Sequence, residues 1–122
     1  MGKKIYGVDL SEKITPMMVR DAIIICFRDA HREVLDELNR KRSSDSEAEI
    51  EGLKKVQIDL IVRSAFEDVK ADFSNPTKED IVKVLGELAK FASRFRKPEI
   101  IKRHYNEIMR LVEKCGHQDI HE

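Results

Sequence analysis

The sequence has no tryptophan, only two cysteines, three prolines and five glycines, and no long apolar run. Two cysteines, Cys26 and Cys115, cannot form the disulfide framework of small secreted proteins, and this favours a reducing compartment. The glycines stand singly, so the sequence lacks the glycine-rich loops that bind phosphate groups. The longest apolar run, residues 22–27, is far shorter than the roughly 20 residues that span a bilayer. We therefore expect a cytoplasmic protein with no membrane contact.

A net charge of either sign is also missing, because 23 Lys and Arg residues balance 23 Asp and Glu residues. A neutral chain has no overall attraction to nucleic acids or to acidic membranes. Charged residues nevertheless make up 38% of the sequence, well above the ~25% of typical domains. Dense charges of both signs with few amide side chains are typical of proteins from hot environments, so the composition favours a thermophilic, archaeal source.

The length of 122 residues predicts one domain over residues 1–122. A chain of this size buries roughly two-thirds of its unfolded surface, so it needs neither a disulfide nor a metal to fold. We expect an N-terminal arm at residues 1–14 that packs on the rest of the chain, with a short extended stretch near Gly7. We expect a frayed tail at residues 117–122.

Helical periodicity and helix caps predict an all-α fold. Thr15 is a good N-cap, and Pro16 suits the first helical position because the N–H that it lacks has no partner there. Ser46 and Glu49 match a capping box, and Thr77 is a third candidate cap. The loops between the apolar stripes are short, which favours antiparallel neighbours. The sequence thus predicts an up-and-down bundle of four helices, at residues 16–41, 47–73, 78–96 and 99–115.

Pro98 leaves the number of helices open. A residue that precedes proline is disfavoured in helical geometry, so the chain at Pro98 either reverses or only bends. If it bends, residues 78–115 form one kinked helix and the fold has three long helices. Three such helices bury their apolar faces poorly alone, so this alternative favours an intertwined dimer.

The first predicted helix is apolar on nearly every face, because Ile23, Ile24, Ile25, Cys26 and Phe27 follow one another. A helix that is apolar all round must be surrounded by other elements. In a four-helix monomer one face would stay in contact with water, so the N-terminal arm or a second subunit should cover it. This pattern favours a non-enzymatic interaction or self-association module, with a homodimer as the expected state.

A mainly basic segment at residues 90–104 favours a second function. If the chain reverses at Pro98, the basic side chains converge at one end of the bundle, where they can neutralise phosphates in a salt-dependent way. A solvated surface with ion pairs inside the protein explains the same pattern, and no known nucleic-acid-binding motif accompanies it. The candidate nucleic-acid contacts are Arg94, Arg96, Lys97, Lys102 and Arg103.

His31 lies in the apolar stripe of the first helix and is the candidate buried polar residue. A buried histidine can be a metal ligand or a general base, but a boundary residue bonded to a neighbouring helix explains it as well. Four residues at the C-terminal end could bind a soft metal: Cys115, His117, Asp119 and His121. Their flexible setting argues against a site. The sequence contains no catalytic or cofactor motif, so we expect no enzyme, no cofactor and no small-molecule ligand.

Overall fold

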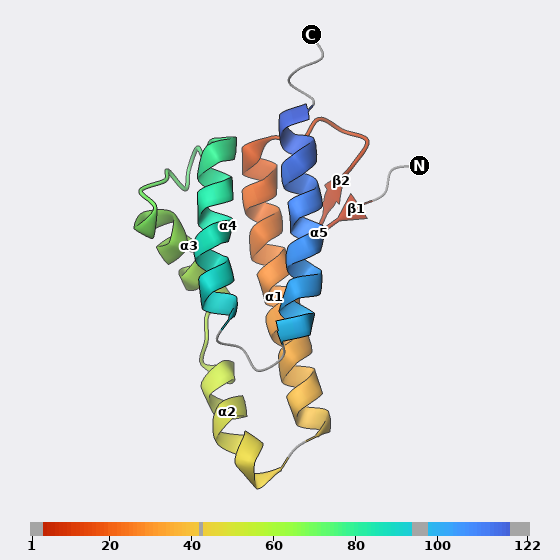
Figure 1. Ribbon diagram of the computed structural model, residues 1–122, viewed down its shortest axis with the longest axis vertical. Coiled ribbons are helices and arrows are strands. Elements are labelled where there is room, and N and C mark those ends of the chain that lie inside the picture. The colour runs from red at the N-terminus through yellow and green to blue at the C-terminus, as the bar shows by residue number, and fades with distance from the viewer. Residues whose placement is uncertain (1–3, 42, 94–97, 118–122) are drawn as a thin grey trace.

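The computed structural model describes residues 4–41, 43–93 and 98–117. Its regular elements are helices, apart from one small hairpin (Figure 1). In chain order the elements are β1 (Lys4–Ile5), β2 (Val8–Asp9), α1 (Pro16–Arg40), α2 (Ser44–Lys54), α3 (Ile58–Asp68), α4 (Lys78–Ala92) and α5 (Pro98–His117). The predicted all-α fold is confirmed, whereas the four-helix arrangement is not, because the described residues form five helices. None of these helices has the length and hydrophobicity needed to cross a membrane.

α1 begins at Pro16, as predicted, and lies at the centre of the bundle (Figure 1). The hydroxyl oxygen of Thr15 accepts a hydrogen bond from the backbone N–H of Met18 at 3.3 Å, which caps the helix. α1 packs against each of the other four helices. Its apolar character on several faces therefore follows from its central position. The buried residues of α1 are Val19, Ala22, Ile23, Cys26, Phe27, Ala30, Val34 and Leu38.

The predicted helix at residues 47–73 is wrong as a single element, because α2 and α3 replace it. α2 begins earlier than predicted, at Ser44, and its C-cap is Lys55. The chain is then extended at Gln57, which precedes α3. This break rotates α3, so that Ile58 is buried whereas Leu60 is 57% exposed. In one uninterrupted helix over residues 47–73, Leu60 would share an apolar stripe with Leu53 and Val56, and that stripe does not continue through the break.

α3 ends at Asp68, short of the predicted residue 73, because the backbone reverses in a Schellman-type cap. Lys70 adopts a left-handed conformation with φ +60°. The backbone N–H of Ala71 donates to the carbonyl oxygen of Phe66 at 2.9 Å, and this bond closes the last turn. Glycine is the usual residue at such a position. A lysine there gives no sequence signal for the end of the helix.

Replacement of Lys70 by glycine is expected to stabilise the protein by about 0.5–1 kcal/mol. The left-handed backbone crowds the Cβ atom of lysine, and relief of that crowding exceeds the extra entropy of glycine in the unfolded chain. Urea unfolding followed by circular dichroism measures the change. Lys83→Gly, at an exposed position inside α4, is the control and should destabilise by about 1 kcal/mol. A loss of stability for Lys70→Gly would contradict the expectation.

α4 and α5 lie side by side and run in opposite directions, so the chain reverses before Pro98 (Figure 1). Pro98 begins α5, a position that suits a residue without a backbone N–H. The alternative of one kinked helix and a three-helix fold is therefore wrong. Thr77 caps α4 as predicted, but α4 ends at Ala92 rather than residue 96. α5 continues to His117, and the rest of the predicted tail lies outside the described residues.

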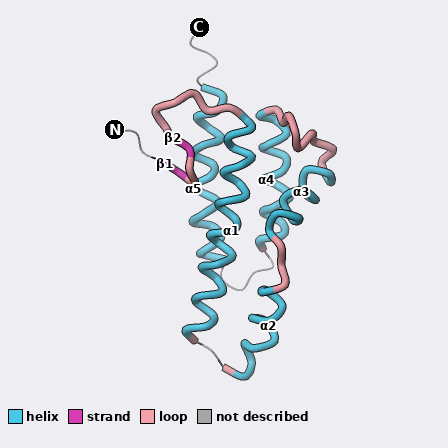
Figure 2. Tube along the Cα trace, turned by 180° about the vertical axis from the view of Figure 1, so that it is seen from behind, coloured by secondary structure: helices cyan, strands magenta, loops and turns pink. Residues whose placement is uncertain are grey.

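The N-terminal arm forms an antiparallel hairpin in which Ile5 pairs with Val8. Tyr6 and Gly7 make the two-residue turn with φ +49° and +84°, which corresponds to a type I′ turn. Ile5 and Val8 are buried, and the hairpin contacts α1 and α5 (Figure 2). The sequence predicted that either the N-terminal arm or a second subunit packs on the exposed face of the first helix. The arm does pack on α1.

Candidate functional site

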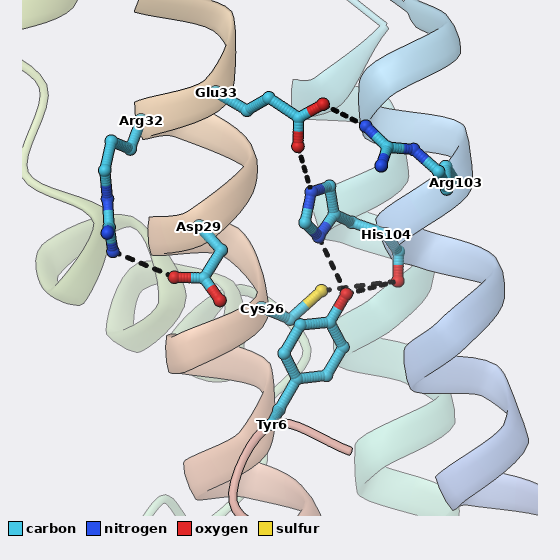
Figure 3. A network of polar contacts seen from close by, with 7 residues as sticks. All are labelled: Tyr6, Cys26, Asp29, Arg32, Glu33, Arg103 and His104. Carbon is cyan, nitrogen blue, oxygen red and sulfur yellow. Dashed lines mark hydrogen bonds and ion pairs between the residues drawn. The ribbon is translucent and has the colours of Figure 1, made fainter. Parts of the chain in front are cut away.

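A cluster of polar side chains connects the hairpin to α1 and α5, with His104 of α5 at its centre (Figure 3). The Nδ1 atom of His104 lies 2.7 Å from the hydroxyl oxygen of Tyr6. Its Nε2 atom lies 2.9 Å from one carboxylate oxygen of Glu33 on α1, and Arg103 donates to the other oxygen. The thiol of Cys26 donates to the backbone carbonyl oxygen of His104 at 3.4 Å. We call these five residues the His104 cluster.

The backbone conformation of Tyr6 is unusual for its residue type. The first position of a type I′ turn favours asparagine, aspartate or glycine, and a tyrosine there costs on the order of 1–3 kcal/mol. The turn places the phenol ring against the imidazole of His104, with 6.0 Å between the ring centroids. The hydroxyl group of Tyr6 thereby reaches the Nδ1 atom of His104. These contacts are the physical reason for a tyrosine at this turn.

The carboxylate of Glu33 only accepts hydrogen bonds, so the Nε2 atom of His104 carries a proton and donates to it. The hydroxyl of Tyr6 is within hydrogen-bond distance of both the Nδ1 atom and the backbone carbonyl oxygen of His104, at 2.7 Å and 3.4 Å. The hydrogen bond from His104 is the main reason that the pKa of Glu33 lies below its ordinary value of 4.5. The bond and charge of Arg103 act in the same direction. Glu33 is therefore a charged carboxylate at neutral pH.

The order carboxylate, imidazole, hydroxyl resembles a hydrolase triad, but burial disfavours the ionised forms of the Tyr6 hydroxyl and the nearby Cys26 thiol. Burial raises the pKa of the Cys26 thiol from 9.0 to about 12. Burial likewise raises the pKa of Tyr6 well above its ordinary value of 10.0. Nucleophilic attack needs a thiolate or phenolate, or a base that removes the proton during the reaction. The contacts of the cluster join the hairpin to α1 and α5.

We expect the thiol of Cys26 to react with a disulfide reagent at least ~100-fold more slowly in the folded protein than in urea. The thiol is 1% exposed, and its raised pKa leaves little thiolate at pH 8. The disulfide reagent releases a coloured thiolate when it reacts. In the Cys115→Ala variant Cys26 is the one cysteine left, so the colour reports on its thiol alone. Similar rates in the folded and unfolded states would show that the hairpin does not cover Cys26.

The structure describes two of the five candidate nucleic-acid contacts, and these two differ in their ion pairs. Arg103 binds Glu33, whereas Lys102 is exposed and has no ion-pair partner among the described residues. Arg94, Arg96 and Lys97 lie outside the described residues. A shallow hollow of about 380 Å³ on α5 carries side chains of both signs. It is lined by Glu99, Lys102, Arg103, Asn106, Glu107 and Arg110.

His31 is partly buried rather than buried, and it connects α1 with the end of α2. Its Nε2 atom lies 2.7 Å from the backbone carbonyl oxygen of Leu53. This is the geometry of a boundary residue bonded to a neighbouring helix. Among residues 4–41, 43–93 and 98–117, no three His, Cys, Asp or Glu side chains gather as metal ligands would. Asp119 and His121, which the sequence analysis considered, lie outside these ranges.

An open, largely apolar groove of about 380 Å³ lies between α3 and α4. It is lined by Leu60, Ile61, Ser64, Ala65, Asp68, Glu87, Leu88, Lys90 and Phe91, and we call it the α3–α4 groove. Leu60 stands at its edge and is 57% exposed. The sequence did not predict this surface, because one uninterrupted helix over residues 47–73 would bury Leu60 beside its apolar neighbours. The break before α3 is what turns Leu60 outward.

Comparison with protein-family models, curated proteins and solved structures found no match for this chain. A function for the protein therefore has to be inferred from the His104 cluster, the charged face of α5 and the α3–α4 groove.

Proposed function

We propose that the protein is a non-enzymatic helical interaction module that associates with a second copy of itself. The exposure of Leu60 beside the α3–α4 groove is the observation that carries this proposal. A large apolar side chain next to an apolar depression, rimmed by charged residues, is typical of interaction surfaces. The rim here consists of Asp68, Glu87 and Lys90.

The position of the hairpin on α1 supports the α3–α4 groove as the interaction surface. The sequence pattern placed the unsatisfied apolar face on α1, where either the arm or a second subunit could cover it. The arm contacts α1 and covers part of that face. Among the large apolar side chains that the structure describes as exposed, Leu60 of α3 has the greatest exposed fraction.

Two further features support a non-enzymatic protein of the cytoplasm. The hydroxyl of Tyr6 and the thiol of Cys26 both have raised pKa values, so neither ionises readily. Cys26 and Cys115 are buried and form no disulfide, as is common for thiols in a reducing compartment.

Sedimentation equilibrium at micromolar concentrations tests the proposal, and the expected mass is about twice the 14.2 kDa of one chain. The experiment is repeated at low and high salt. Apolar association should persist at high salt, whereas association through exposed ion pairs should weaken. A mass equal to one chain at every concentration would refute self-association.

Nucleic-acid binding is the second candidate, and it is favoured by the exposed Lys102, which has no ion-pair partner among the described residues. Lys102 and Arg103 share an exposed surface of α5 with Arg110. Glu99 and Glu107 on the same surface, and Glu33 bound to Arg103, reduce its positive charge. Binding of single- and double-stranded RNA and DNA at low and moderate salt tests this function. Salt-sensitive binding that Lys102→Glu weakens would support it, and no binding at low salt would exclude it.

A further inference from the structure

We infer that the second copy docks on the α3–α4 groove, with the α3 helices of the two subunits packed antiparallel across a two-fold axis near Ser64. This inference names the interface for the proposed self-association, and it rests on that proposal. Two properties of the groove lead to it: the line of side chains along α3 and the mixture of charges of both signs at the rim.

The exposed side of α3 has the shape that such packing requires. Leu60, Ser64 and Asp68 are four residues apart, so they follow one line along the helix. Ser64 in the middle is small and exposed, which lets the backbone of a partner helix approach closely. Each Leu60 then packs against the partner's groove. The apolar residues that line this groove are Ile61, Ala65, Leu88 and Phe91.

The groove carries charges of both signs, with Lys90 and its partner Glu87 on α4 and Asp68 at the end of α3. α3 and α4 are antiparallel, so Lys90 near the end of α4 lies beside the beginning of α3, and Asp68 lies at the other end. Asp68 has no hydrogen bond or ion pair with any described residue. Lys90 contacts Glu87 at 3.2 Å, but its side chain is 78% exposed and the ammonium group keeps free donors.

A two-fold axis through the middle of the groove places each Lys90 opposite the Asp68 of the second copy. An interface across such an axis must be complementary to itself, and the groove meets this condition in both charge and shape. A groove of one sign would instead suit a partner of the opposite charge. The presence of both signs is why we assign a second copy rather than a charged peptide.

Leu60→Asp tests the apolar contact, with Val82→Asp as the matched control. Val82 is 48% exposed on α4 and does not line the groove, so the control adds the same charge to a similar exposed site. We expect Leu60→Asp to raise the dissociation constant of the dimer by roughly 30-fold or more. Val82→Asp should leave it unchanged. Circular dichroism verifies that both variants fold, as expected for exposed positions.

Ser64→Cys tests the position of the axis. If the two Ser64 residues face each other, the introduced thiols form a disulfide under mild oxidation, because this bond requires Cα atoms within about 7 Å. We expect a covalent dimer on a non-reducing gel. The parent chain, whose two cysteines are buried, and the Val82→Cys variant should remain uncrosslinked.

The outcomes separate this inference from the proposed function. A monomeric parent chain overturns both. A dimer that persists in Leu60→Asp, with no crosslink in Ser64→Cys, overturns the groove as the interface and leaves self-association standing. Dissociation by Leu60→Asp without a crosslink in Ser64→Cys keeps the groove but overturns the antiparallel two-fold arrangement.

Discussion

Phe66→Ala is expected to lower the free energy of unfolding by about 3–5 kcal/mol, the range for removal of a buried aromatic ring. Phe66 is 1% exposed. Its ring meets that of Phe73 edge to face, with 5.1 Å between centroids and an angle of 78°. The side chain belongs to α3, whereas Phe73 lies in the segment between α3 and α4. The loss of the ring therefore leaves a cavity and removes the support of that segment.

Phe73 extends the effect of this substitution to α1. The guanidinium groups of Arg20 and Arg63 lie 4.7 Å and 4.2 Å from the centroid of its ring. Arg20 also donates to the backbone carbonyl oxygen of Phe73 at 2.6 Å. A displaced Phe73 weakens these cation–π contacts, which contribute roughly 0.5–1 kcal/mol each at partly exposed sites. We therefore expect a value in the upper part of the range.

Urea unfolding followed by circular dichroism measures the effect of Phe66→Ala. Val82→Ala is the control, because truncation of a side chain that is 48% exposed should change stability by no more than about 0.5 kcal/mol. A loss below about 1 kcal/mol for Phe66→Ala would show that α3 does not pack on the bundle through this ring.

Tyr6→Phe is expected to cost about 1–3 kcal/mol, since it removes the hydroxyl that hydrogen-bonds to the Nδ1 atom of His104. The side chain of His104 is 14% exposed, so water replaces the phenol hydroxyl poorly. The substitution keeps the aromatic ring and the strained turn. It removes only the hydroxyl oxygen, which makes the hydrogen bond to His104. The reaction rate of Cys26 should rise in this variant, because the hairpin opens more often.

Tyr105→Phe provides the matched control for Tyr6→Phe. Tyr105 is also partly buried and lies next to His104 on α5, but its hydroxyl has no hydrogen bond with any described residue. We expect its removal to change neither stability nor the labelling of Cys26. Combination of Tyr6→Phe with His104→Gln should give a coupling energy of about 0.5–3 kcal/mol if the two side chains act together. Additive losses would refute a direct Tyr6–His104 interaction.

The parts of the fold that depend on local chemistry were predictable from the sequence. Thr15 and Pro16 mark the start of α1, and Thr77 marks the start of α4, because a cap needs only a few neighbouring residues. The break before α3 was not predictable in this way. Apolar residues continue through it, and Lys70 occupies a position where glycine would have signalled the end of the helix.

The His104 cluster was not predictable because its contacts join distant parts of the chain. Tyr6 and His104 are 98 residues apart, and Glu33 and His104 are 71 apart. Each residue alone resembles an ordinary polar position on a helix or in a turn. The one available signal was Gly7, whose place after a short apolar strand suits the second position of a type I′ turn. The hairpin was foreseeable from it, whereas the partner of Tyr6 was not.

α2 and the C-terminal end of α1 extend beyond the other helices, and α2 packs chiefly against α1 (Figure 2). Native proteins open in cooperative units, and the free energy of each opening follows the packing that it disrupts. Detachment of α2 gives up the contact of Leu53 with His31 but leaves the interface between α1 and α5 intact. We therefore expect the amide protons of α2 to exchange through a partial unfolding, at a lower free energy than those of α5, which gives the bundle two levels of stability.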